Sequence, residues 1–482
     1  MSTTRSATQR PTQFGTAPDP DTVTSRHQTA ILAIVCISYF MVILDNSIIF
    51  TGLPSIQAAM DLSPTGLTWV QDAYTLVFGG LLLISARAGD IVGRRRMFMI
   101  GLVLFGAASF LVGIAPFSWW LIAARAVQGI GAAILATSSL ALLTASFADG
   151  RERARAVAAY GAVAGIGASA GLVVGGVLAD LISWRAGFLL NVPIGIVMLL
   201  ASRRYLVGRE LTERGRFDVP GAILATLGMT GLVYAVIESA ESSWTSPTTI
   251  VPLLVGVVLL AAFVVNESRV AQPIMPLRLF ADRRRTGAYL VRMLYLGAMI
   301  GFFFFTTQYL QDALGFSPLQ AGFAFLPMSG VNFMVAVLVN RVIGRFGTTA
   351  TLIAGVAFTL VGMAWLSQIT ASSSYVGAVA LPMVLIGIGQ GLAFAPMTSA
   401  GIAGVAAGDA GAASGVINTF HQLGSALGLS VVTAVGVAVT PSGASGATAV
   451  VARAGGALAA GSGLLVLALI LVVVLIARRP AA

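Results

Sequence analysis

The chain has 482 residues, of which 57% are hydrophobic and 10% are charged, and its mean hydropathy is +0.92. Soluble domains carry about 25% charged residues, so a chain with so few charges cannot cover a water-facing surface of this size. The composition excludes a soluble enzyme, and its hydrophobicity excludes a disordered chain. It predicts a polytopic membrane protein.

The basic residues are all arginine, and 28 of them stand against 18 acidic residues. Without lysine the chain lacks the lysine of a Walker phosphate loop, so ATP-driven transport by this polypeptide alone is not expected. A single cysteine, Cys36, excludes an internal disulfide, and His27 and His421 are too few for a Cys/His metal site. We therefore expect no metal, no cofactor and no enzyme activity.

Residues 1–28 are rich in Ser, Thr, Pro and Gln and predict a disordered tail rather than a cleaved signal peptide, which would carry a short apolar stretch. A helix that spans a bilayer needs about 20 apolar residues. By that measure about fourteen segments span the membrane. They lie near 30–52, 67–86, 97–115, 119–144, 156–179, 186–203, 219–238, 248–266, 287–310, 320–341, 348–367, 376–398, 411–438 and 454–477.

The arginines predict the topology through the positive-inside rule. With the N-terminus in the cytoplasm, 24 of them fall in the tail, the cytoplasmic loops and the C-terminus. Arg185 and Arg453 fall in outer loops, and Arg125 and Arg292 fall within spans. A miscounted helix would reverse every later loop, so we expect an even number of spans with both termini cytoplasmic. Arginines spread between apolar runs do not form a nucleic-acid groove.

Two short loops at matching places in the chain carry glycine and arginine. Residues 86–96, after the second span, read ARAGDIVGRRR, and residues 340–347, after the tenth, read NRVIGRFG. In the first loop Asp90, Gly93, Arg94 and Arg95 predict a tight clamp that gates a conformational change. The similar loop in the second half predicts that the chain consists of duplicated halves, as in secondary transporters. The alternative is that each loop is an ordinary cytoplasmic loop whose arginines follow the positive-inside rule.

Polar and small residues within the fourth and fifth spans are further candidates. Arg125 is costly inside a span and by default faces a cavity or an acidic partner, the alternative being that it snorkels outward. Gln128 lies one turn away beside small residues. Gly171 and Gly175 belong to a glycine stripe that allows close helix contact, which fits a sliding hinge and simple packing equally well.

Read together, these motifs resemble the major facilitator superfamily, and further segments are similar to its fourteen-helix drug:proton antiporter branch and its quaternary-ammonium exporter subgroup. The resemblance runs in order from about residue 30 to about residue 435. It rests on LDNSIIFTGLP at 44–54, WVQDAYTL at 69–76, GDIVGRRR at 89–96, RAVQGIGAA at 125–133, WRAGFLLNVP at 184–193 and GAASGVINTFHQLG at 411–424.

The resemblance implies an all-α major-facilitator fold with two six-helix bundles and an extra helix pair. The tail then occupies 1–28, the N-terminal bundle 29–205, a linker with two extra helices 206–280, and the C-terminal bundle 281–482.

Two positions depart from the family pattern. Ala86 replaces the glycine that opens the loop motif, and Leu172 replaces a proline in the fifth span, so the expected kink point is lost and tight coupling of export is less firmly implied.

Carboxylates within spans are few, and Asp45 and Asp72 lie at comparable depth, about 7–11 Å from the outer surface by helix rise. Two close acids in a low dielectric can hold a proton near neutral pH, and when ionised they attract a lipophilic cation. Competition between proton and cation is the simplest physical basis for antiport. For Asp72 the alternative is a water-exposed acid at a helix start.

Other candidates for substrate binding are Tyr74, Gln128, Asn418 and Gln422. His421 fits a packed polar contact better than a proton relay, and Arg292 is expected to snorkel to the cytoplasm. Glu238 and Asp312 fit solvated charges at outer span ends. The four phenylalanines 302–305 fit an aromatic cavity or ordinary packing.

We therefore expect a monomeric, multi-pass transporter of the bacterial inner membrane. It would export hydrophobic or cationic drug-like molecules by alternating access, with protons as the coupling ion and Asp45, Asp72 and Arg125 as the coupling residues. The alternatives are a transporter or importer specific for one metabolite, and a non-transporting membrane sensor.

Overall fold

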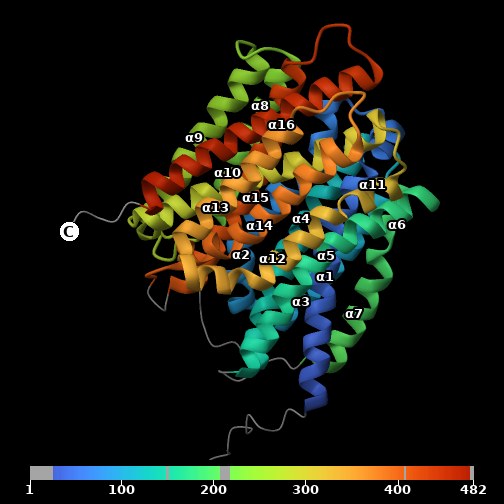
Figure 1. Ribbon diagram of the computed structural model, residues 1–482. Helices are drawn as coiled ribbons and strands as arrows, with labels where there is room; N and C mark the ends of the chain where they lie inside the picture. The colour runs from blue at the N-terminus through green and yellow to red at the C-terminus, as the bar shows by residue number, and fades with distance from the viewer. Residues whose placement is uncertain (1–24, 148–150, 207–217, 406–408, 478–482) are drawn as a thin grey trace, which may run out of the picture.

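The computed structural model describes residues 25–147, 151–206, 218–405 and 409–477, and this part of the chain is almost entirely helical (Figure 1). It contains 14 helical segments that are long and apolar enough to cross a membrane. The predicted fold class and number of spans are therefore confirmed. The expected tail lies, as far as residue 24, outside the described residues.

The first six spans form the N-terminal half. The sixth is broken at Leu190, three residues before Pro193, a residue that cannot donate a helical hydrogen bond. The helices are α1 (Ser25–Met60), α2 (Pro64–Val92), α3 (Arg94–Gly113), α4 (Ser118–Ser146), α5 (Arg151–Leu181), α6 (Trp184–Leu189) and α7 (Asn191–Tyr205).

The last six spans form the C-terminal half, and here a break at Phe325 precedes Pro327. The elements are α10 (Arg283–Gln308), η3 (Tyr309–Ala313), α11 (Pro318–Ala324), α12 (Leu326–Phe346), α13 (Thr348–Leu366), η4 (Val376–Ala380), α14 (Leu381–Ile402), α15 (Ala410–Ala438), α16 (Gly446–Leu471) and η6 (Val472–Ala477).

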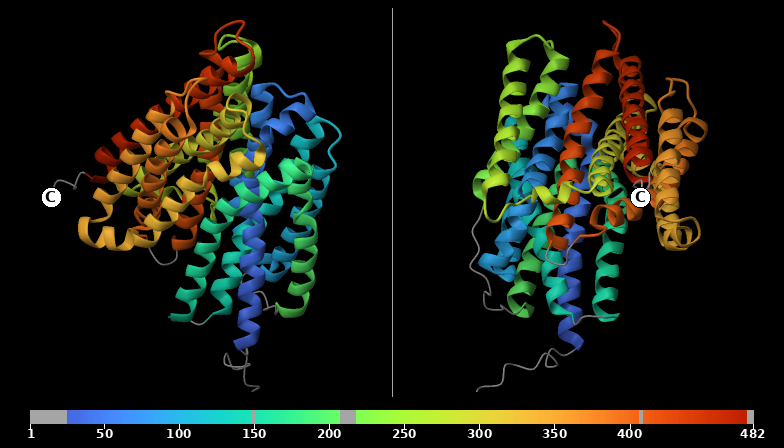
Figure 2. Two further views of the ribbon diagram at one scale, coloured as in Figure 1. Left: turned by 45° about the vertical axis from the view of Figure 1, so that its right-hand side comes forward. Right: turned by 90° about the vertical axis from the view of Figure 1, so that its left-hand side faces the viewer.

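Between the halves lies the extra pair, α8 (Val219–Glu241) and α9 (Pro247–Arg269), which pack against each other along one flank of the molecule (Figures 1 and 2). A short 3-10 helix, η2 (Leu277–Phe280), follows. Helix α8 also packs on α2 and α15, one helix from each half. Helix α9 exposes an apolar face, including Val251, Leu254 and Val258, so it fits a lipid-facing position.

We call the side of the membrane at which α1 begins the N-terminal side, and the other the opposite side. With 14 spans, the last one returns to the N-terminal side. The two echoed loops lie there, and each is a single glycine between two helices. Gly93 joins α2 to α3 with φ +104°, and Gly347 joins α12 to α13 with φ +82°. Both values favour glycine, so the repeat seen in the sequence recurs in the backbone.

The halves meet along two seams. On one, α5 packs against α11, and a Cβ on Gly176 would lie 2.6 Å from the carbonyl oxygen of Pro318. On the other, α2 packs against α15, and a Cβ on Gly79 would lie 2.6 Å from Cβ of Gln422. Glycine is required at both positions because the helices approach too closely for a side chain.

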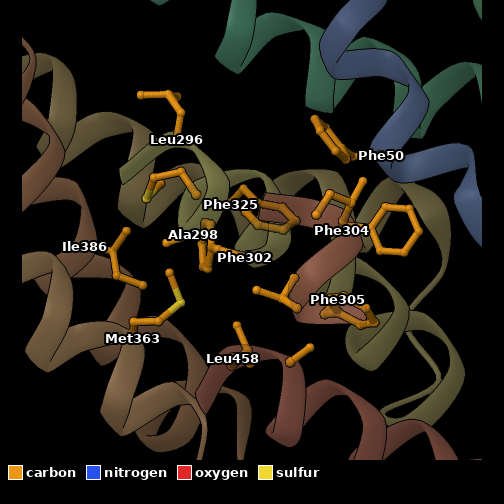
Figure 3. Packing of buried hydrophobic residues seen from close by; sticks show 14 of the residues in the cluster. Phe50, Leu296, Ala298, Phe302, Phe304, Phe305, Phe325, Met363, Ile386 and Leu458 are labelled. Atoms are coloured by element: carbon orange, nitrogen blue, oxygen red, sulfur yellow. The ribbon is translucent and has the colours of Figure 1, made fainter. Parts of the chain in front are cut away.

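Three of the four consecutive phenylalanines, Phe302, Phe304 and Phe305, are buried in the largest apolar core (Figure 3). Phe303 is partly buried and stacks on Phe50 of α1 with 5.5 Å between ring centroids. Of the two uses expected for these residues, the structure shows packing.

Two boundaries differ from the sequence prediction. Helix α1 continues to Met60 instead of ending near residue 52, so Pro54 lies inside the helix without ending it. Helix α16 begins at Gly446, so Arg453 lies within a helix and lines a cavity of about 380 Å³ at the opposite side together with Glu241. Arg185 likewise lies within α6, so the prediction that Arg185 and Arg453 belong to outer loops is wrong.

Candidate functional site

Asp45 lies inside α1, is completely buried, and joins several helices of the N-terminal half. Its Oδ2 accepts a hydrogen bond from Arg125 Nη1 on α4 at 2.9 Å. Its Oδ1 accepts from Gln128 Nε2 at 2.8 Å and from Asn191 Nδ2 on α7 at 2.7 Å. Ser109 Oγ on α3 accepts from the same Gln128 nitrogen at 2.8 Å. One carboxylate thus holds α1, α4 and α7 in register.

Arg125 is also completely buried. Its Nε donates to the carbonyl oxygen of Val70 at 3.0 Å, and its Nη1 donates to Gln128 Oε1 at 2.6 Å. The guanidinium carbon lies 4.3 Å from the ring centroid of Tyr74 and 5.6 Å from that of Phe188. Arg125 therefore has the acidic partner that its place in a span predicts. Tyr74 is buried and its ring faces the guanidinium.

The glycine stripe of α5 packs directly against the part of α1 that carries Asp45. A Cβ on Gly171 would lie 2.5 Å from Cβ of Ser47 and 2.9 Å from the carbonyl oxygen of Leu44. A Cβ on Gly175 would lie 2.6 Å from Oγ1 of Thr51. The stripe therefore serves close packing, and it fixes α1 on both sides of the buried acid.

Asp72 lies in α2 at the seam with α15 and is also completely buried. Its Oδ2 accepts a hydrogen bond from Ser430 Oγ at 2.8 Å, and its Oδ1 has no partner among the described residues. No arginine pairs with it in the described part of the chain. The alternative, that Asp72 is a water-exposed acid at a helix start, is therefore wrong, and the acid lies buried within the span.

The two acids lie at similar depth, because their sequence neighbours Asn46 and Gln71 form a hydrogen bond of 3.0 Å between Gln71 Nε2 and Asn46 Oδ1. Their hydrogen-bond partners differ, however. Among the described residues, Asp45 is bonded within the N-terminal half, whereas Asp72 is bonded to the C-terminal half. The two acids therefore lie in different environments, and their shared role in holding a proton stays a prediction.

The predicted polar residues of α15 differ in exposure. Asn418 is exposed and donates to the carbonyl oxygen of Ser414 at 3.0 Å, whereas Gln422 is partly buried. His421 Nδ1 lies 3.1 Å from Nη2 of Arg292. Arg292 is only 6% exposed, so the expectation that it snorkels to the cytoplasm is wrong.

The predicted clamp ties together helices of one half. Arg94 Nη1 donates to the carbonyl oxygen of Ala141 on α4 at 3.3 Å, and Arg95 Nη2 donates to that of Arg203 on α7 at 3.1 Å. Gly93 supplies the turn. The backbone of Asp90 lies in the last turns of α2, but its side chain is outside the described residues.

A comparison with protein families decides the identification. Residues 35–429 match the profile described as Major Facilitator Superfamily. The chain belongs to the Major Facilitator Superfamily. This match covers more than three quarters of the chain, and it confirms the resemblance that the motifs indicated.

Several curated members of the superfamily are similar along most of their length. A cephamycin export protein of Amycolatopsis lactamdurans is 42% identical over 84% of this chain and 85% of its own. A puromycin resistance protein of Streptomyces alboniger is 38% identical over 82% and 79%. The multidrug resistance protein Stp of Mycobacterium tuberculosis is 36% identical over 84% and 75%. These relatives agree with the drug-exporter branch.

Solved structures agree on the fold. A bacterial homologue of the human lysosomal transporter Spinster, in an inward-facing and unoccupied conformation, superposes with a TM-score of 0.69 at 15% identity and covers 95% of this chain and all of its own. A mutant of the nucleoside transporter NupG gives a TM-score of 0.65 at 11% identity over 93% of this chain and all of its own. Both likenesses are of fold alone.

In this member of the superfamily, sequence reasoning missed three residues that complete the two acid sites. Asn191 and Ser109 belong to the Asp45 cluster, and Ser430 is the partner of Asp72. The sequence does single out Asn191, because it stands in the family motif at 184–193. Nothing in the sequence distinguishes Ser109 and Ser430, because a serine in a span ordinarily bonds its own helix backbone.

Proposed function

We propose that this protein exports hydrophobic, drug-like small molecules across the bacterial inner membrane by alternating access, driven by protons. Family membership and the names of the similar export and resistance proteins support export of small molecules. The observation that carries proton coupling is Asp72, a buried acid without a cationic partner at the seam between the halves, among the residues that the structure describes.

Burying an uncompensated charge costs far more than burying a neutral polar group. In the described conformation Asp72 has one hydroxyl donor and no positive partner from the described chain, so its neutral, protonated form is the one that this environment accepts. When the α2–α15 seam opens, water reaches the carboxyl and hydration stabilises the charged form. Asp72 would then take up a proton on one side and release it on the other.

Asp45 has a different role in this proposal. Its charge is balanced by Arg125 and it accepts hydrogen bonds from two amides, so it remains an ion-pair partner that fixes the helices. Coupling would therefore depend on Asp72, while Asp45 and Arg125 hold the N-terminal half rigid as it moves. The protein would work as a monomer in lipid, without a bound cofactor.

The orientation in the membrane follows from the arginines. Of the 28 arginines, all except Arg125, Arg185, Arg292 and Arg453 lie in the tail, in the connections of the N-terminal side, or within a few residues of helix ends there. The positive-inside rule then makes the N-terminal side the cytoplasm. Both termini would be cytoplasmic.

Proton-driven transport in proteoliposomes tests the proposal. The purified protein is reconstituted, a pH gradient is imposed, and movement of a panel of drugs and dyes is recorded. We expect gradient-driven transport by the wild type, and we expect Asp72→Asn to lose it while retaining exchange of labelled for unlabelled substrate, which needs no net proton movement.

Asp61→Asn is the matched control, because Asp61 is exposed and asparagine tolerates its positive φ of 50°. This variant should keep gradient-driven transport. Undiminished uphill transport by Asp72→Asn would show that the proton is carried elsewhere, and an absence of any transport by the wild type would contradict export itself.

A further inference from the structure

Arg292 is a buried cation without a balancing charge in the described part of the chain. It lies on α10, about 13 Å along the helix from Arg283, and is 6% exposed. Its Nη2 is 3.1 Å from His421 Nδ1 on α15, and its Nη1 is 3.4 Å from Oγ1 of Thr398 on α14. Its Nε has no hydrogen-bond partner, and no carboxylate pairs with it, among the described residues.

The other arginine buried in a span shows what a structural guanidinium looks like in this chain. Arg125 has a carboxylate, an amide oxygen and a backbone carbonyl as acceptors. Each of the two guanidinium groups leaves one nitrogen without a hydrogen-bond partner among the described residues, Nη2 in Arg125 and Nε in Arg292. The difference is the carboxylate, because the hydrogen-bonding contacts of Arg292 in the described chain, Thr398 and His421, are not anionic. A charge within the membrane is expensive and by default faces a partner or a pathway. Because no anionic partner for Arg292 comes from the described chain, the missing anion is expected to come from a ligand.

The surroundings of Arg292 are aromatic and partly open. Its guanidinium carbon lies 4.3 Å from the ring centroid of Phe394. Thr398 is exposed and His421 is partly exposed, so the two contacts of the guanidinium border accessible surface.

We propose that Arg292 binds the carboxylate of an amphipathic, aromatic substrate between α10, α14 and α15. Its Nε and Nη groups would donate to the two carboxylate oxygens, with the Phe394 ring as an aromatic wall. The Thr398 hydroxyl borders the site but donates to the carbonyl oxygen of Phe394 at 3.0 Å. Arginine is suited to this because its planar fork matches a carboxylate. The inference rests on the proposed function and gives it a substrate class, organic anions, that differs from the predicted cations.

Binding to the purified protein in detergent tests this without requiring transport. N-dansyl-phenylalanine is a fluorescent aromatic carboxylate, and its amide has the same shape without the charge. We expect the wild type to bind the carboxylate about tenfold more tightly than the amide, as a charge-assisted hydrogen bond implies. Arg292→Gln should remove this preference. Arg345→Gln is the matched control, because Arg345 is exposed and lies 5.6 Å from the Phe346 ring.

A second variant tests the site without removing the buried Arg292 side chain. Thr398→Asp places a carboxylate next to the Arg292 guanidinium from an exposed position, so it should occupy the site and abolish the preference for the carboxylate ligand. Thr398→Asn has nearly the same shape without the charge and should keep it. This pair leaves Arg292 in place, and retained binding of the uncharged amide by Thr398→Asp distinguishes an occupied site from loss of folding.

Three results would overturn the inference. The first is equal binding of acid and amide by the wild type. The second is an unchanged preference for the acid in both Arg292→Gln and Thr398→Asp. The third is binding of an anionic phospholipid, added to the detergent, without binding of the dansyl acid. In the last case the anion would be a lipid phosphate. Export of cationic dyes without carboxylate binding would leave the proposed function intact, whereas carboxylate binding without any transport would contradict only export.

Discussion

At the scale of single residues, the buried charges of this protein are not equivalent. Asp45 and Arg125 neutralise each other, Asp72 has only a hydroxyl partner in the described chain, and Arg292 has only neutral partners there. Sequence patterns can show that all four are costly in a membrane. They cannot show which of them are paired, because the pairing depends on the packing register of helices far apart in the chain.

The Asp45–Arg125 pair predicts a non-additive effect on stability. Asp45→Asn leaves Arg125 buried without a counter-charge, and breaking such a pair costs about 3–5 kcal/mol. We expect a large fall in the apparent Tm of the detergent-solubilised protein. The double variant, Asp45→Asn with Arg125→Gln, should lower the apparent Tm by much less than the sum of the two single variants, because it leaves no uncompensated charge. Strictly additive losses would show that the two side chains do not interact.

The pair of Arg278 and Asp409 predicts a pH effect outside the membrane. Arg278 Nε and Nη2 donate to the two carboxylate oxygens at 2.9 and 2.6 Å, and these hydrogen bonds hold the pKa of Asp409 below its ordinary value of 3.8. A pKa lowered by folding stabilises the fold above the ordinary value, and this contribution is lost as the pH falls through the lowered one.

Asp409→Asn should therefore lower the Tm slightly at pH 7 and low salt, and the difference from the wild type should vanish in about 1 M salt, where the screening length is about 3 Å. It should also shrink as the pH falls below the ordinary aspartate pKa of 3.8 and vanish once the pH has fallen through the lowered pKa. Because the Arg278 side chain is 65% exposed and that of Asp409 is 22% exposed, solvent screens the pair and we expect only a small effect. A Tm difference that survives high salt would mean that the contact is not ionic.

At the scale of elements, the helices and their order could be predicted, because a run of about 20 apolar residues has few other structures in lipid. The breaks before Pro193 and Pro327 and the extension of α1 to Met60 could not, since neighbouring helices decide whether a proline ends a helix or is tolerated within it. The glycine stripe of α5 indicated close packing, but only the structure identifies α1 as its partner.

The stripe gives a prediction with its control in the same helix. Gly171→Ala would place a methyl group 2.5 Å from Cβ of Ser47, so α1 and α5 must separate and the bonds of Asp45 must lengthen. We expect a clear loss of Tm and of transport. Gly161→Ala meets no atom within 4 Å and should keep both. Equal behaviour of the two variants would show that the α1–α5 contact does not constrain the protein.

At the scale of the whole molecule, the halves are held together at the opposite side. Gln311 Nε2 of η3 donates to the carbonyl oxygen of Thr51 at 2.9 Å, and Ser317 Oγ donates to Asp180 Oδ2 at 3.0 Å. Toward the N-terminal side, α12 instead exposes apolar side chains such as Phe333 and Val337. Alternating access requires the contacts at the opposite side to break and re-form.

A reversible cross-link tests whether that separation is needed. In a Cys36→Ser background, Asp180→Cys together with Ser317→Cys places two thiols at positions whose side chains are now joined by a hydrogen bond of 3.0 Å. Oxidation should stop transport, because the halves can no longer part on this side, and reduction should restore it. Each single cysteine variant should be insensitive to oxidant. Continued transport by the oxidised, fully cross-linked protein would mean that the α5–α11 seam stays closed throughout the cycle, and access would then have to alternate at the α2–α15 seam that carries Asp72.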